Sequence, residues 1–226
     1  MSFLIIFDCD GVLVDSELLE HGVDAELLGP LGYAASAREL LQRFVGIART
    51  DMYEVVFSEL GREMPRGLLE ERERRVWQRC RSHLKTVAGV EGALEALRQQ
   101  PKCVASSSIP EKLQLKLGST GLARHFAPHI FSTTLVARGK PAPDIYLHAA
   151  QVVGHAADRC LVVEDSRHGI AGAKAAGMRA IGFAGGSHVT PSLAADLRLA
   201  GAAIVVDHMD DLPKAIHDLS GVNDGQ

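Results

Sequence analysis

The chain has 226 residues, of which 46% are hydrophobic and 23% are charged, a composition typical of a globular protein with a substantial core. Its 24 Lys and Arg residues against 28 Asp and Glu residues give a formal net charge of -4, which disfavours binding to nucleic acid or to an anionic membrane surface. No apolar run approaches the roughly 18 residues of a membrane span. We therefore expect a cytoplasmic protein with no nucleic-acid, membrane or obligate protein partner.

Short apolar runs of strand length recur along the chain, and several lack polar alternation, which is typical of strands buried on both faces. In chain order they cover residues 3–7, 103–106, 129–133, 161–164, 180–183 and 203–206. Segments with helical periodicity lie between the later runs, at 90–97, 145–152 and 170–176. This alternation predicts an α/β fold, a Rossmann-like parallel sheet flanked by helices.

A long segment without a convincing strand separates the first run from the others. Its apolar residues favour helices, so we expect an inserted all-helical domain at 16–87 and a core domain formed by 1–15 and 88–226. The segment contains an arginine-rich stretch from Glu70 to Arg81 that is interspersed with glutamates. Such spacing favours a solvated helix face, held by pairs three or four residues apart, over a binding patch.

Polar side chains collect where the predicted strands end. These residues are Asp8 and Asp10 after the first strand, Ser106 to Ser108 at the end of the second, Lys140 after the third, and Glu164 and Asp165 at the end of the fourth. In open parallel sheets, ligands bind in the crevice outside the carboxyl ends of the strands. We therefore expect these separated groups to converge on one site.

Carboxylates that crowd together repel one another and resist ionisation unless a cation is present. An all-oxygen set of Asp8, Asp165, Glu164 and a backbone carbonyl near Asp10, completed by water, suits Mg²⁺. Lys140 would add a second positive charge and Ser106 a hydroxyl donor. Two cationic centres with donors predict a pocket for a dianionic oxyanion, of which phosphate is the commonest.

Each part of this site also has a plainer interpretation when it is taken alone. Asp8 and Asp10 can form a turn or a helix cap, and Lys140 can be a solvated loop lysine. Glu164 and Asp165 can cap the helix that follows them. The joint occurrence of these groups at successive strand ends favours a functional site.

Four segments together resemble the motifs of the haloacid dehalogenase superfamily, and more narrowly its phosphatases and phosphomutases with a helical cap domain. They are DCDGVLVDSE at 8–17, VASSS at 104–108, GKPAPDIY at 139–146 and VEDSRHGIAGAKAAGM at 163–178. The resemblance covers nearly the whole chain in order. It also places a cap domain at the position of the inserted helical segment.

The resemblance implies that Asp8 is the nucleophile that forms an aspartyl phosphate. It implies that Asp10 protonates the leaving alcohol and, in a hydrolase, then activates water. Ser106 and Lys140 would hold phosphoryl oxygens. The implied metal site for Mg²⁺ is formed by Asp8, Asp10, Glu164 and Asp165.

Further residues are candidates for substrate binding. Ser107 and Ser108 can supply phosphate donors or cap the next helix. The segment VGIARTD at 45–51 resembles the cap loop that faces the substrate in related enzymes, which makes Gly46 and Arg49 candidates, with Arg49 for a carboxylate or a distal phosphate. A structural surface arginine fits Arg49 almost as well.

The chain departs from the phosphomutases of the family at two places. Glu20 replaces the histidine expected just beyond the first motif, and Ile109 with Pro110 replaces the Lys-Asn pair after the serines. Both differences favour hydrolysis over internal transfer. The resemblance thus implies a Mg²⁺-dependent phosphatase, a phosphoric monoester hydrolase, whose partner is a small phosphorylated metabolite such as a sugar or sugar-acid phosphate.

The sequence leaves three alternatives open. A phosphomutase would share the first step and return the phosphoryl group to another hydroxyl. A metal-independent dehalogenase gives no reason for Asp10, Glu164 and Asp165 to cluster. A phosphate-binding or phospho-aspartate signalling module is disfavoured by the general acid Asp10 and by an insert large enough to exclude water. No role is assigned to Glu20, Cys9 or His188.

Overall fold

The structure is a computed structural model that describes residues 3–44 and 47–221. The chain forms two compact units, one of Met1–Asp15 with Lys85–Gln226 and one of Ser16–Leu84. Among the described residues, no helix is both long enough and apolar enough to cross a membrane.

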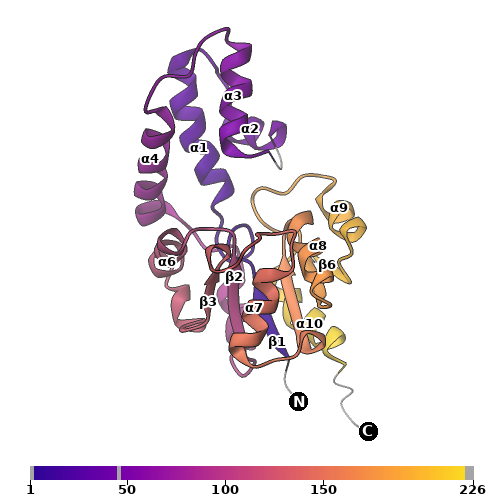
Figure 1. Cartoon of the computed structure of the whole chain (residues 1–226). Coiled ribbons are helices and arrows are strands. Elements are labelled where there is room, and N and C mark those ends of the chain that lie inside the picture. Colours follow the sequence, from indigo (N-terminus) through magenta and orange to yellow (C-terminus); the bar gives the residue numbers. More distant parts are fainter. Residues whose placement is uncertain (1–2, 45–46, 222–226) are drawn as a thin grey trace. The chain divides into compact units, whose positions relative to one another are not determined.

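The first unit is built on a parallel sheet with the strand order β3-β2-β1-β4-β5-β6 (Figure 1). Its strands are β1 Leu4–Phe7, β2 Lys102–Ser106, β3 Ile130–Ser132, β4 Cys160–Glu164, β5 Arg179–Phe183 and β6 Ile204–Val206. The chain builds outward from β1 in one direction through β2 and β3, and in the other through β4, β5 and β6. The carboxyl ends of β1, β2 and β4 therefore meet at the point where the order reverses, which is where such sheets bind ligands.

Helices cover the sheet, so the expected α/β fold is confirmed. They are α5 Val90–Ala96, α6 Pro110–Ser119, α7 Asp144–Val153, α8 Arg167–Ala175, α9 Leu193–Ala200 and α10 Leu212–Ser220. Leu4 and Ile6 share one buried cluster with Ile145 of α7 and Ala173 of α8. All four residues of β1 are fully buried, which explains why the apolar run at the start of the chain shows no polar alternation.

The second unit consists of helices in its described part. They are α1 Glu17–Leu28, α2 Ala37–Arg43, α3 Arg49–Glu59 and α4 Leu68–His83, and α1 packs against α2 and α4 (Figure 1). Within the arginine-rich helix α4, Arg74 and Arg75 each pair with Glu71 at 2.7 Å, as expected for a solvated face. Arg72 departs from that expectation because it is only 5% exposed.

Candidate active site

The ends of three adjacent strands bring polar side chains together in the first unit. Asp8 directly follows β1, Ser106 ends β2 and Glu164 ends β4, and these residues are 7%, 1% and 1% exposed. The N–H of Asp8 donates to the carbonyl of Val163 at 2.9 Å, which extends the β1–β4 ladder by one residue. The sheet itself therefore fixes the main chain beneath the Asp8 carboxylate.

Lys140 links the three strand ends. Its Nζ donates to Asp8 Oδ1, to Glu164 Oε1 at 2.6 Å and to the carbonyl of Ala105 at 2.9 Å. These contacts use all three hydrogens of the ammonium group. The side chain is 6% exposed, so Lys140 is not a solvated loop lysine.

Glu164 is held on both carboxylate oxygens. Its Oε1 also accepts from the hydroxyl of Tyr146 at 3.0 Å, and its Oε2 accepts from the N–H and the hydroxyl of Ser166 at 3.0 and 2.9 Å. Gly169 leaves room for this carboxylate, because a Cβ there would lie 1.9 Å from Glu164 Cδ. The start of α8 is therefore built around the Glu164 side chain.

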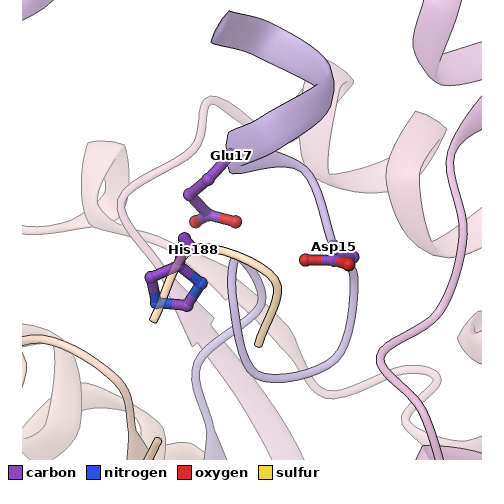
Figure 2. Close-up of side chains that lie close together, drawn as sticks. All are labelled: Asp15, Glu17 and His188. Atoms are coloured by element: carbon purple, nitrogen blue, oxygen red, sulfur yellow. The ribbon is translucent and has the colours of Figure 1, made fainter. Parts of the chain in front are cut away.

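The loop after β5 reaches the remaining acidic residue. Asp165 Oδ2 lies 3.0 Å from Nε2 of His188. The adjacent Ser187 donates its N–H and hydroxyl to Asp15 Oδ1 at 3.1 and 2.6 Å. Figure 2 shows the Asp15 and His188 side chains of this unit, together with Glu17, which begins α1 of the second unit. The Ser187 contacts tie the His188 loop to the loop after β1.

The electrostatics of the site favour a cation. Asp8, Glu164 and Asp165 can each place a carboxylate oxygen within 4.8 Å of the others. Burial raises the pKa of Asp8, against the opposing effect of Lys140, and burial also raises the pKa of Asp165. Burial acts in the same sense on Glu164, but Lys140 and the hydrogen bonds at α8 outweigh it and lower the pKa of that residue. Three buried carboxylates, two of them paired with Lys140, form an all-oxygen donor set that fits Mg²⁺.

The Asp10 side chain lies outside this acidic group. Its Oδ2 accepts from the hydroxyl of Ser108 at 2.8 Å, and its Oδ1 forms an ion pair with Lys116 of α6. Two metal ligands were expected at this position, the side chain of Asp10 and a nearby backbone carbonyl. The side chain is engaged with Ser108 and Lys116 instead. The backbone carbonyl near Asp10 remains the expected donor.

The serine run after β2 is organised internally. The hydroxyl of Ser106 accepts from the N–H of Ser108 at 3.1 Å, and the hydroxyl of Ser132 donates to the carbonyl of Ser108 at 2.7 Å. Ser107 is exposed. Ser106 and Ser108 therefore belong to one hydrogen-bonded loop beside Asp8 and Asp10, whereas Ser107 points to solvent.

The substrate-binding candidates of the second unit are Gly46 and Arg49. Gly46 lies outside the described residues. Arg49 begins α3, its side chain is 28% exposed, and its Nη1 lies 2.6 Å from Asp24 Oδ2 and 2.7 Å from Nδ1 of His21. Asp24 is fully buried and also accepts from Arg72 at 2.9 Å. Arg49 is therefore part of a buried ion-pair network, with a partly exposed guanidinium.

Sequence reasoning missed Lys116 and Tyr146. Lys116 occupies the buried face of α6 with Leu113 and Leu117, so a lysine that interrupts an apolar stripe was the available signal. Tyr146 lies within the GKPAPDIY segment, but nothing in the pattern identified its hydroxyl as a donor to Glu164.

The parallel sheet, its reversal point and the buried carboxylate and lysine group define a doubly wound α/β protein whose candidate site lies at the carboxyl ends of the strands. A family model described as haloacid dehalogenase-like hydrolase matches residues 5–183. The chain therefore belongs to the haloacid dehalogenase-like hydrolase family, which confirms the resemblance seen in the sequence.

Known relatives agree with this assignment. The chain is 29% identical over 188 residues to the 6-phosphogluconate phosphatase of Escherichia coli K12, an alignment that covers 83% of this chain and 85% of that one. A conserved haloacid dehalogenase-like protein of unknown function from Agrobacterium tumefaciens C58 has a TM-score of 0.89 and 44% identity, with coverage of 97% and 100%. A family hydrolase from Deinococcus radiodurans R1, solved with bound phosphate and sodium, has a TM-score of 0.86, 32% identity and 96% coverage of both chains.

Proposed function

We propose that this protein is a Mg²⁺-dependent phosphatase that hydrolyses small phosphorylated metabolites through an aspartyl phosphate on Asp8. The observation that carries the proposal is the buried group of Asp8, Glu164 and Asp165 with Lys140 in contact with two of its members. Such a group provides a carboxylate nucleophile together with fixed positive charge for phosphoryl oxygens. The relative that binds phosphate and the relative named as a phosphatase support this choice of substrate chemistry.

In the first half-reaction, an oxygen of Asp8 attacks phosphorus while the bond from phosphorus to the substrate oxygen breaks. Asp10, which must enter this step protonated, gives its proton to that leaving oxygen, so a neutral alcohol departs. Lys140 and the hydroxyl of Ser106 would neutralise and orient the phosphoryl oxygens, whose charge is spread over three positions in the transition state.

In the second half-reaction, water attacks the phosphorus of the aspartyl phosphate. Asp10 takes the proton from that water, the bond from phosphorus to Asp8 breaks, and inorganic phosphate leaves. Asp8, Asp165 and Glu164, with a backbone carbonyl near Asp10, would hold Mg²⁺, which supplies charge neutralisation for the phosphoryl group. Asp8 and Asp10 can take different roles because their carboxylates have different partners, Lys140 for one and Lys116 for the other.

The relatives and the second unit support a choice of substrate class. The named relative is a 6-phosphogluconate phosphatase, which places a sugar-acid phosphate among the first compounds to test. We propose that Arg49 binds a carboxylate or a distal phosphate of the substrate, because a guanidinium forms paired hydrogen bonds with such groups.

A screen of phosphorylated metabolites with purified protein and Mg²⁺ tests the proposal. We expect inorganic phosphate to be released catalytically from sugar or sugar-acid phosphates, with a phosphoprotein that appears transiently. Formation of an isomeric sugar phosphate without inorganic phosphate would identify a mutase. A stable phosphoprotein without turnover would identify a signalling module.

A further inference from the structure

We infer that Lys116 is a positioning residue that, together with Ser108, holds the Asp10 carboxylate in the orientation needed for proton transfer. The inference rests on the proposed phosphatase mechanism, in which Asp10 moves protons. Nothing in the motifs assigns a role to Lys116, which lies ten residues beyond Ser106 in a different element.

The two oxygens of Asp10 are held by two different donors of one segment. Ser108, just before α6, donates its hydroxyl to Oδ2 at 2.8 Å, and the ammonium group of Lys116 within α6 contacts Oδ1. Ser108 is itself fixed, because its N–H donates to Ser106 Oγ and its carbonyl accepts from Ser132. Because both oxygens of the Asp10 carboxylate accept from donors of this segment, the carboxylate has little freedom to rotate.

The burial of Lys116 points to a specific purpose. Its side chain is 2% exposed, whereas the side chain of Asp10 is 25% exposed. Lysines are almost never fully buried unless they are paired, because removing an ammonium group from water is costly. Lys116 lies on the same face of α6 as Leu113 and Leu117, where an apolar residue would pack without that cost. The helix therefore carries a charge inward to the carboxylate of Asp10.

The ion pair also separates the tasks of the acidic residues. Asp8, Glu164 and Asp165 form the group that can hold a cation, and Asp10 is drawn to α6 instead. Lys116 neither gives nor takes a proton in this scheme. It keeps the Asp10 carboxylate aimed at the leaving oxygen and at the attacking water, and the rate of proton transfer depends strongly on that geometry.

Rapid-quench kinetics of Lys116→Met with two substrates test this role. We expect phosphoenzyme formation from an alkyl phosphate to slow by about 10-fold or more, the scale of an impaired general acid. Formation from p-nitrophenyl phosphate should change little, because nitrophenolate leaves without a proton. Hydrolysis of the phosphoenzyme should slow equally after both substrates, because the intermediate is the same. Lys214→Met, at a 79% exposed position paired with Asp218, is the matched control and should behave as wild type.

A double-mutant cycle separates positioning from a general structural effect. If Lys116 acts through Asp10, Lys116→Met should cause no further slowing in an Asp10→Asn background. Independent, additive slowing would overturn the inference. Ser108→Ala, which removes the other donor, should show the same dependence on the leaving group and serves if Lys116→Met does not fold.

The inference and the proposed function can fail separately. If wild-type protein forms no phosphoenzyme on Asp8, the proposed function fails. If wild type turns over through the phosphoenzyme and Lys116→Met matches it with the alkyl phosphate, only the role of Lys116 fails.

Discussion

The carboxylate of Asp165 occupies the space that any side chain at Gly11 would need. A Cβ at Gly11 would lie 1.9 Å from Asp165 Oδ2 and 2.7 Å from Cε1 of His188. Gly11 also has a φ of +72°, a conformation that favours glycine. The loop after β1 can therefore approach the loops after β4 and β5 only if position 11 carries no side chain.

Gly11→Ala should weaken Mg²⁺ binding because the new methyl group displaces Asp165. We expect the Mg²⁺ concentration for half-maximal activity to rise by about 10-fold, as is typical when the surroundings of a metal ligand are disturbed. Gly177→Ala is the matched control, since Gly177 has a φ of +73° and a Cβ there would meet no atom within 4 Å. It should lose about 1 kcal/mol of unfolding free energy from backbone strain and keep the wild-type Mg²⁺ response. If the two variants respond equally to Mg²⁺, displacement of Asp165 does not weaken Mg²⁺ binding and the prediction is wrong.

Asp8→Asn should abolish the phosphoenzyme. An amide is not a competent nucleophile toward phosphorus, and this substitution keeps the size of the side chain. The measurement is acid-quenched phosphoprotein after mixing with a labelled substrate. The Lys140–Glu164 pair, at 2.6 Å, does not involve Asp8, so the variant should still fold. Labelled phosphoprotein in Asp8→Asn would show that another residue is the nucleophile.

Asp10→Asn should leave substrate binding largely intact and slow both half-reactions. We expect a loss of about 100-fold in each rate with an alkyl phosphate, the usual contribution of a general acid or base. Single-turnover formation and decay of the phosphoenzyme give the two rates separately. A large rise in the Michaelis constant with unchanged turnover would instead indicate that Asp10 acts in binding.

The second unit should lose stability in acid through His21. Arg49 donates to Nδ1 of His21 at 2.7 Å, and burial, then the charge of Arg49, lower the pKa of His21 from 6.5 to about 4. The unfolded chain therefore binds a proton at His21 more readily than the folded chain does. The stabilisation from neutral His21 is complete above pH 6.5 and is lost as the pH falls toward 4. We expect the free energy of unfolding to fall by about 2 kcal/mol over that interval. This is less than the full pKa shift implies, because solvent screens part of the interaction.

Urea unfolding at neutral pH and near pH 4 measures this effect, with His21→Gln as the comparison. Glutamine retains an acceptor for Arg49 and does not titrate. The variant should lose less unfolding free energy on acidification than wild type. If both proteins lose the same amount, His21 does not carry the acid sensitivity.

The fold could be predicted because buried parallel strands appear in the sequence as continuous apolar runs, and because their carboxyl ends lie at one edge of the sheet. That edge brings Asp8, Ser106 and Glu164 together whatever their separation in the sequence. The pairing of Asp10 with Lys116 could not be predicted, because it depends on how α6 approaches the β1 loop. The inward position of Lys116 on an apolar stripe was nevertheless visible in the spacing.

The burial of Arg72 in α4 could not be predicted from composition for a related reason. Arg72 falls in a charged stretch, so composition indicated solvent exposure. Its spacing from Leu68, Val76 and Cys80 is four residues at each step, and all four side chains share the buried face. Periodicity was thus the better guide here, whereas the partner of Arg72, the buried Asp24, could be identified only from the packing of α1 against α4.

Arg49 can be removed without leaving Asp24 unpaired, which makes its functional role testable. Asp24 Oδ1 accepts from Arg72 at 2.9 Å and from the hydroxyl of Tyr53 at 3.0 Å, and both contacts are independent of Arg49. We therefore expect Arg49→Ala to fold and to raise the Michaelis constant for a sugar-acid phosphate by about 10-fold or more, the scale of a lost charged hydrogen bond. The constant for p-nitrophenyl phosphate, which has no distal anionic group, should change little.

Arg74→Ala provides the control for that experiment, because Arg74 is 64% exposed and pairs with Glu71 on the solvated face of α4. It removes the same charge from the same unit and should leave both Michaelis constants unchanged. Steady-state phosphate release gives the Michaelis constants of wild type, Arg49→Ala and Arg74→Ala for both substrates. If Arg49→Ala impairs both substrates equally, its guanidinium serves the ion-pair network with Asp24 and His21, and substrate selection must reside in other residues.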